Sequence, residues 1–113
     1  MTTTTALTPE QQRVLDAIPT SRGRAATIGR IAEAAGVSRD YRSERKTRDV
    51  IRSLRLRGHP IASCDFGYFL AECAEDLERT RTQLYSRVKG IVEVCDAIER
   101  TREREFVKEG RLF

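Results

Sequence analysis

Basic side chains are concentrated in one stretch of the sequence, residues 39–57. The stretch holds eight Arg and Lys residues against three acidic ones, a local charge of +5, whereas the whole chain carries +4. A positive charge gathered in one place favours a polyanionic partner. Guanidinium groups suit both phosphate oxygens and the O6/N7 edge of guanine. The basic residues are Arg39, Arg42, Arg45, Lys46, Arg48, Arg52, Arg55 and Arg57.

The same stretch predicts a helix over about 43–57. Ser43 is expected to be its N-cap, because a serine hydroxyl can accept a backbone N–H of the first turn. Gly58 is expected to end it. An apolar or half-apolar stripe recurs at i, i+3, i+4 and i+7, which is the spacing of one buried helix face. The stripe consists of Thr47, Val50, Ile51 and Leu54.

This helix has a second, charged face. At about 100° per residue, Arg45, Asp49 and Arg52 lie roughly opposite the apolar stripe, with Arg48 on its flank. One face can therefore pack on a small core while the other presents guanidinium groups to a ligand. The alternative is a basic helix that only faces water.

Residues suited to catalysis or metal binding are not arranged for either. His59 lies in a predicted turn with no evident nucleophile beside it. The glycines do not match a phosphate-binding loop. Cys64, Cys73 and Cys95 lack the close spacing of a zinc site, and their odd number argues against a disulfide framework. We expect reduced thiols, no enzyme activity, no cofactor and no metal.

Length and composition indicate a small protein with one modest core. The chain has 113 residues, of which 34% are charged and 6% aromatic. Such a chain forms one domain, with an appendage at most. No run approaches the roughly 18 apolar residues of a membrane span, and no signal peptide precedes the chain. We expect a cytoplasmic protein without a membrane partner.

Two helices are expected before the basic helix. Thr8, Pro9 and Gln11 form the N-cap, first position and N3 position of a capping box. The inward side of this first helix consists of Val14, Leu15 and Ile18. The second helix is expected at about Ile28–Ala35, capped by Thr27 and closed by Gly36.

A β-hairpin is expected after the basic helix. Two short β-prone runs, residues 60–63 and 68–70, flank a turn with Asp and Gly. Gly67 can supply the positive φ that such a turn requires.

A heptad pattern predicts one helix over about 72–109. Its seam consists of Leu77, Leu84, Val88, Ile91, Cys95 and Ile98. Arg81 and Arg102 occupy the outer a positions and limit the apolar seam to its middle. A continuous helix would be about 50 Å long at about 1.5 Å per residue. Its own small domain cannot cover that length, so we expect a homodimer. The alternative is a helix pair that folds back at a bend near Gly90.

The order of helix, helix, basic helix, hairpin and long helix resembles the winged helix-turn-helix family. Residues 31–38, IAEAAGVS, are similar to its second helix and turn. Residues 50–61, VIRSLRLRGHPI, are similar to a recognition helix that runs into a wing, and residues 67–70, GYFL, to the return strand. The resemblance covers about Leu7–Leu70. It includes small winged-helix proteins of phages and prophages and the DNA-binding domain of the biotin operon repressor.

The resemblance implies an α+β fold, mainly α with a small β-hairpin. The expected divisions are a disordered tail over 1–6, a winged helix-turn-helix domain over 7–71, a dimerisation helix over 72–109 and a frayed tail over 110–113. The sequence departs from the family in the turn before the basic helix. Residues 39–43 lengthen that turn and make it more basic.

Double-stranded DNA is the partner that the resemblance implies. The residues facing the major groove would be Ser43, Arg45, Lys46, Arg48, Asp49 and Arg52. Phosphate contacts would come from Arg55 and Arg57, and from Arg39 and Arg42 in the lengthened turn. The wing tip, Asp65 and Phe66, carries no Arg or Lys and is expected to contribute little.

The expected function is a dimeric, sequence-specific transcriptional regulator of phage, prophage or bacterial type. Two alternatives remain open on the same fold. One is a protein-interaction module, such as a phage-type adaptor or an inhibitor of a host enzyme. The other is an accessory DNA binder in replication or recombination.

Overall fold

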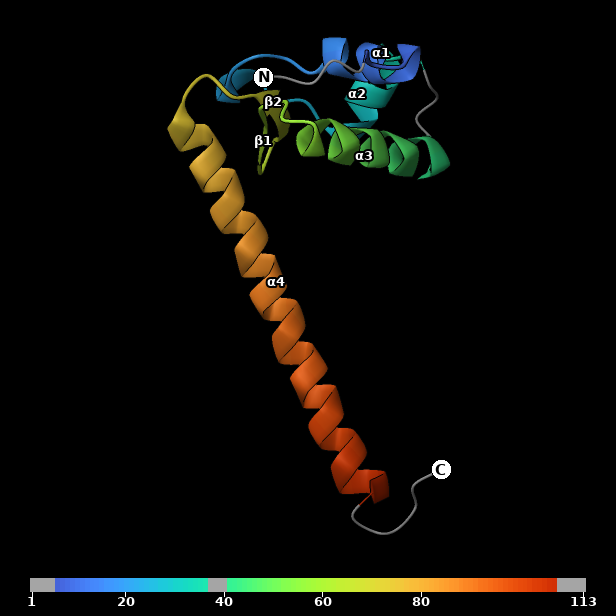
Figure 1. The fold of residues 1–113 in the computed structure, drawn as a ribbon, viewed down its shortest axis with the longest axis vertical. Helices are drawn as coiled ribbons and strands as arrows, with labels where there is room; N and C mark the ends of the chain where they lie inside the picture. Colours follow the sequence, from blue (N-terminus) through green and yellow to red (C-terminus); the bar gives the residue numbers. More distant parts are fainter. Residues whose placement is uncertain (1–5, 37–40, 108–113) are drawn as a thin grey trace. The chain divides into compact units, whose positions relative to one another are not determined.

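The computed structural model describes residues 6–36 and 41–107 of the chain (Figure 1). Its elements are α1 (Pro9–Ala17), η1 (Arg22–Arg24), α2 (Ile28–Ala34), α3 (Tyr41–Leu56), β1 (Ile61–Cys64), β2 (Gly67–Leu70), α4 (Ala74–Arg102) and η2 (Glu103–Val107). The predicted fold class is confirmed: the chain is mainly α, with one antiparallel hairpin and a long C-terminal helix. The chain divides into two compact units, Met1–Thr80 and Arg81–Phe113.

The first helix begins with the predicted capping box. Thr8 Oγ1 accepts the backbone N–H of Gln11 at 3.1 Å, and Gln11 Oε1 accepts the backbone N–H of Thr8 at 3.0 Å. Pro9 occupies the first turn, where its missing N–H costs nothing. At α2 the predicted cap is also present, because Thr27 Oγ1 accepts the N–H of Arg30 at 3.3 Å. These local signals fix where both helices start.

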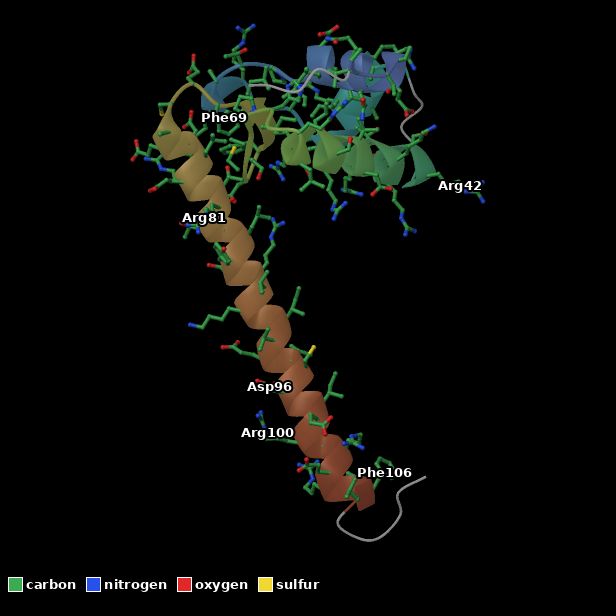
Figure 2. The ribbon with its side chains drawn as sticks, in the orientation of Figure 1. Arg42, Phe69, Arg81, Asp96, Arg100 and Phe106 are labelled. Atoms are coloured by element: carbon green, nitrogen blue, oxygen red, sulfur yellow. The ribbon has the colours of Figure 1, made fainter. Side chains whose placement is uncertain are left out.

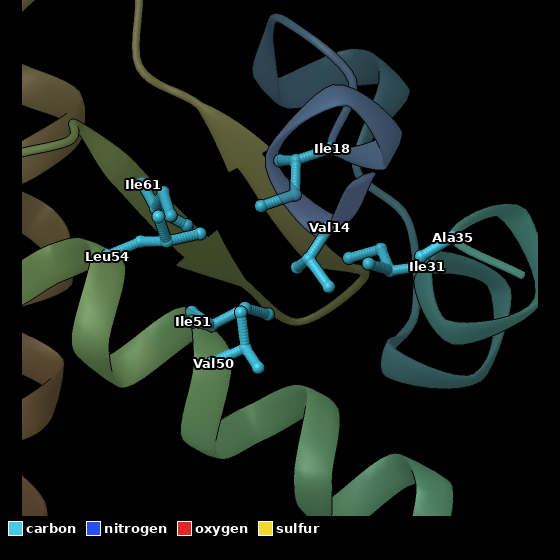
Figure 3. Packing of buried hydrophobic residues seen from close by; sticks show 8 residues of the cluster. All are labelled: Val14, Ile18, Ile31, Ala35, Val50, Ile51, Leu54 and Ile61. Atoms are coloured by element: carbon cyan, nitrogen blue, oxygen red, sulfur yellow. The ribbon is translucent and has the colours of Figure 1, made fainter. Parts of the chain in front are cut away.

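A single small core holds α1, α2, α3 and β1 together (Figure 3). In the close-up, side chains from the three helices and the first strand converge on one point. The cluster consists of Val14, Ile18, Ile31, Ala35, Val50, Ile51, Leu54 and Ile61. The predicted stripe of α3 is confirmed, since Thr47 exposes only 3% of its surface and the other three members are also buried.

The start of α3 differs from the sequence prediction. The helix begins at Tyr41, so the assignment of Ser43 as its N-cap is wrong. Ser43 lies inside the first turn, where its carbonyl oxygen accepts the hydroxyl of Thr47 at 2.7 Å. It is half-buried and extends the core-facing stripe by one turn. Residues 41–43 therefore belong to the helix and not to a lengthened turn. Arg39 and Asp40, the other two residues of that predicted turn, lie outside the described residues, as do residues 37 and 38.

The hairpin has the two predicted strands with small shifts: β1 begins and ends one residue later than predicted, and β2 begins one residue earlier, at Gly67. Its register pairs Ile61 with Leu70 and Cys64 with Gly67, which leaves a two-residue turn. Gly67 has φ +132°, and a Cβ there would lie 2.1 Å from the backbone oxygen of Ala26. Only glycine allows this close approach.

Both outer edges of the hairpin are occupied. On the β2 side, Ala26 and Tyr68 exchange backbone hydrogen bonds of 2.9 and 2.8 Å. On the β1 side, Thr80 Oγ1 accepts the N–H of Ser63 at 3.0 Å. Thr80 exposes 5% of its surface and belongs to the second turn of α4. This hydroxyl joins the start of α4 to the strand within the first unit.

The long helix runs without interruption from Ala74 to Arg102, through Gly90. The alternative of a bend near Gly90 is therefore wrong. The α-helix ends earlier than the predicted residue 109, and a wider π-helical segment, η2, follows it. Of the tails predicted over 1–6 and 110–113, residues 1–5 and 110–113 lie outside the described residues. No described helix combines the length and apolar character of a membrane span.

Candidate nucleic-acid interface

Four arginines lie on the exposed side of α3, together with one aspartate. Arg42, Arg45, Arg48, Asp49 and Arg52 all have exposed side chains, and we call this surface the basic face. Figure 2 shows side chains with blue nitrogen tips extending from α3 away from α1 and α2, with Arg42 at the N-terminal end of the helix. The opposite side of α3 is buried in the core, so the helix is held in place by one side and presents charge on the other.

Most of the basic face is not neutralised. Among the residues that the structure describes, Arg42, Arg45 and Arg52 have no ion-pair partner. The Nη2 atom of Arg48 lies 4.0 Å from Glu44 Oε1, at the outer limit of an ion pair. An exposed pair of this kind is worth at most about 1 kcal/mol, so it leaves Arg48 able to exchange partners.

Lys46 and Ser43 lie off the basic face. Lys46 Nζ is 3.1 Å from Glu10 Oε2, on the side where α1 packs against α3. Ser43 faces the core side, as described above. The sequence grouped both residues with the groove-facing arginines, whereas the structure separates them.

Arg55 and Arg57 make contacts inside the domain. Arg55 Nε donates to the carbonyl oxygen of Ile61 at 2.9 Å, and its guanidinium lies 5.6 Å from the centre of the Tyr68 ring. Arg57 Nη1 donates to Gln11 Oε1 at 2.9 Å. Both side chains are half-buried. These two arginines connect α3 to the hairpin and to α1.

The tip of the hairpin is fully presented to solvent. Phe66 exposes 72% of its surface, and Asp65 beside it is also exposed. The aspartate gives this tip a local negative charge, which opposes phosphate contacts.

On α3, an exposed apolar residue lies outside the predicted site. Leu56 exposes 71% of its surface at the C-terminal end of α3. It follows Arg52 by four residues, so helical periodicity places it on the same side as Arg45, Asp49 and Arg52. That spacing is the sequence signal that could have found it.

The predicted seam of α4 is exposed in the part of the chain that the structure describes. Ile91 and Ile98 each expose 63% of their surface, and Val88 exposes 54%. The remaining members, Leu77, Leu84 and Cys95, are exposed as well. A stripe this apolar is unusual on a free surface and is typical of a contact with another helix.

The described parts of the chain also contain residues that could bind metals or react as thiols. No group of three or more His, Cys, Asp or Glu residues there could hold a metal ion. Cys64, Cys73 and Cys95 are free thiols, and Cys64 is the half-buried one of the three. The described residues therefore present an exposed basic face on α3 and an exposed apolar seam on α4.

Comparison of the chain with protein-family models, with curated proteins and with solved structures finds no match.

Proposed function

We propose that the protein is a dimeric double-stranded DNA-binding protein, a sequence-specific transcriptional regulator of phage, prophage or bacterial type. In this proposal α3 enters the major groove through its basic face. The observation that carries the proposal is the set of exposed arginines on a helix whose other side is anchored in the core. An α-helix fits the width of the major groove, and arginine binds guanine edges and phosphates in a bidentate manner.

Within the basic face, charge and position suggest separate tasks. Arg42 stands in the first turn of α3 and is suited to a phosphate contact. Asp49 lies between Arg45 and Arg52 along the outward line. A carboxylate cannot bind a phosphate, but it can accept the N4 amino group of cytosine, so Asp49 favours base recognition over non-specific attraction.

The dimer in this proposal is supported by the predicted heptad seam of α4, which we call the a/d seam. It consists of Leu77, Leu84, Val88, Ile91, Cys95 and Ile98. Its exposed apolar residues need a partner helix, and a second copy supplies the same pattern. A dimer carries two basic faces and therefore fits a site made of two half-sites.

The experiment that tests the proposal is selection of bound sequences from random double-stranded DNA, followed by binding measurements on the selected site. We expect a two-part site and a log K that falls with log salt by about 0.9 for each phosphate neutralised. Replacing Arg48 and Arg52 with Ala should abolish the sequence preference. Arg100→Ala, on the exposed polar side of α4, is the control that should leave it unchanged. Binding without any enriched sequence would overturn the regulator proposal.

A protein-interaction module is the second candidate, because the uncovered face of α4 would also serve a different protein. It predicts capture of a partner that survives nuclease treatment and high salt. An accessory role in replication or recombination predicts instead that the selected DNA is bent when bound.

A further inference from the structure

The α4 helix carries a second apolar line beside the a/d seam. Gly90, Val94, Ala97 and Thr101 follow one another at spacings of four, three and four residues, which again is a heptad pattern. We call this line the small-residue seam. At about 100° per residue, its centre lies about 110° around the helix from the centre of the a/d seam.

Two shallow apolar grooves lie between the small-residue seam and the a/d seam, and residues of both seams line them. One is lined by Arg87, Gly90, Ile91, Val94 and Cys95. The other is lined by Val94, Ala97, Ile98, Thr101, Arg102 and Phe106. Gly90 has open space where a side chain would stand. The Thr101 hydroxyl is used within the helix, since it donates to the carbonyl oxygen of Ala97 at 2.9 Å. This side of α4 therefore offers hollows with little polar character.

The opposite flank of the a/d seam is less suited to a helix contact. There the guanidinium of Arg81 lies 4.8 Å from the centre of the Tyr85 ring. Glu99, farther along this flank, holds Arg102 through a 2.6 Å contact. A helix that packed here would have to displace or bury these charges, which is costly.

We propose that the small-residue seam binds a second copy of α4 in antiparallel orientation, so that two a/d dimers form a four-helix bundle. This inference rests on the dimer in the proposed function. The directions of the two seams support four helices. In a square bundle the two neighbours of a helix lie about 90° apart, and in a triangular bundle about 60°, so about 110° is closer to the square.

The sizes of the side chains select the antiparallel orientation. Two antiparallel copies can be aligned so that the midpoint between Val94 and Ala97 of one helix lies opposite the same midpoint of the other. Each Val94 then faces Ala97 of the second copy. In the same alignment each Gly90 faces Thr101 of the second copy. Large side chains then oppose small ones in every layer, as close packing requires. A parallel pair in register would set Gly90 against Gly90 and leave a void.

The remaining side of the helix supports the same arrangement. Lys89, Glu93, Asp96 and Arg100 lie opposite the two seams and are all exposed. They form the only stripe of the segment 84–101 that is continuously polar, which is the pattern of a helix with neighbours on two sides. A tetramer carries two pairs of basic faces, so one assembly can bind two separate DNA sites.

The mass of the full chain in solution tests this inference. We expect about 52 kDa by light scattering, four times the 12.9 kDa of the chain. Ala97→Glu should lower the mass to that of a dimer, because two carboxylates would be buried in the seam. Arg100→Glu, three residues away on the polar stripe, should remain a tetramer. A wild-type mass of a dimer or trimer, or an Ala97→Glu variant that stays tetrameric, would overturn the inference.

Cysteine cross-linking tests the orientation without a charge in the seam. In chains with Cys64, Cys73 and Cys95 replaced by Ser, Val94→Cys and Ala97→Cys are made singly and co-expressed with different tags. We expect a disulfide between the two variants on mild oxidation. Cross-linking of Val94→Cys only to itself would contradict the antiparallel seam.

Binding to a short duplex with one site separates this inference from the proposed function. Ala97→Glu should bind that duplex as the wild type does. If neither protein binds DNA while the wild type is a tetramer that Ala97→Glu dissociates, the DNA proposal fails and the bundle stands.

Discussion

The guanidinium of Arg57 donates to the side-chain oxygen of Gln11 at 2.9 Å, and the same oxygen accepts the backbone N–H of Thr8 at 3.0 Å. The amide nitrogen of Gln11 also donates to the Ser53 hydroxyl at 3.3 Å. One side chain therefore closes the capping box of α1 and contacts both Ser53 in α3 and Arg57 directly after that helix. The helix that carries the basic face is positioned partly through this glutamine.

Replacing Gln11 with Ala should destabilise the domain by about 1–2 kcal/mol, because a cap and a hydrogen bond to a charged group are lost together. Gln11→Glu should retain most of the stability, since a carboxylate accepts the same two bonds. Urea unfolding measures both. Gln12→Ala is the matched control: Gln12 is exposed, and its amide donates to Asp16 one turn away in the same helix. Equal losses for Gln11→Ala and Gln12→Ala would contradict the link between the helices.

Gly67→Ala should destabilise the fold by about 3 kcal/mol or more, since the new Cβ would overlap the backbone of Ala26 and the positive φ disfavours any side chain. Thermal unfolding gives the comparison. Gly23→Ala is the control, because nothing lies within 4 Å of a Cβ at that position. A small shift for Gly67→Ala would mean that the backbone of the hairpin moves away easily.

Thr80→Val should cost about 1–3 kcal/mol, because it keeps the shape of the side chain but leaves the N–H of Ser63 without its acceptor. Thr82→Val, at an exposed position of the same helix, should be nearly neutral. Hydrogen exchange at the Ser63 amide reports the bond directly: exchange should accelerate in Thr80→Val and stay unchanged in Thr82→Val.

Arg52→Ala should lower the affinity for DNA, whereas Arg55→Ala should lower the stability of the fold. Arg52 is exposed and has no ion-pair partner among the described residues, so its loss should weaken DNA binding by about 1–3 kcal/mol without changing stability. Arg55 bonds to Ile61 and lies against Tyr68, so its loss should lower stability by about 1–2 kcal/mol. Anisotropy with the selected duplex and urea unfolding separate the two effects. If Arg52→Ala unfolds more readily than Arg55→Ala, the division between interface and scaffold is wrong.

The pKa of Glu99 should lie below its ordinary value of 4.5, because Arg102 donates hydrogen bonds to the carboxylate. A lowered pKa stabilises the folded helix above the ordinary value, and that contribution is lost as the pH falls through the lowered pKa. Carbon NMR of the side-chain carboxyl follows the titration. In Arg102→Gln the pKa of Glu99 should return toward 4.5.

Local patterns determine much of this fold and were therefore accessible from the sequence. The caps at Thr8 and Thr27 depend on residues within one turn, and the stripe of α3 depends only on helical spacing. The start of α3 was not accessible, because serine is tolerated inside a first turn as well as at a cap. The sequence also predicts DNA contacts for both Arg52 and Arg55, the first in the groove and the second on phosphates. What distinguishes them is the carbonyl of Ile61 and the ring of Tyr68, which only the folded hairpin brings within reach.

The place of Thr80 in the chain bears on how the protein can be divided. A truncated fragment that ends at residue 71, where the sequence pattern changes, would lack Thr80. The N–H of Ser63 on the outer edge of β1 would then have no acceptor from that hydroxyl. The exposed strand would be free to pair with strands of other molecules and promote aggregation. Expression of the first unit alone should therefore extend through the second turn of α4.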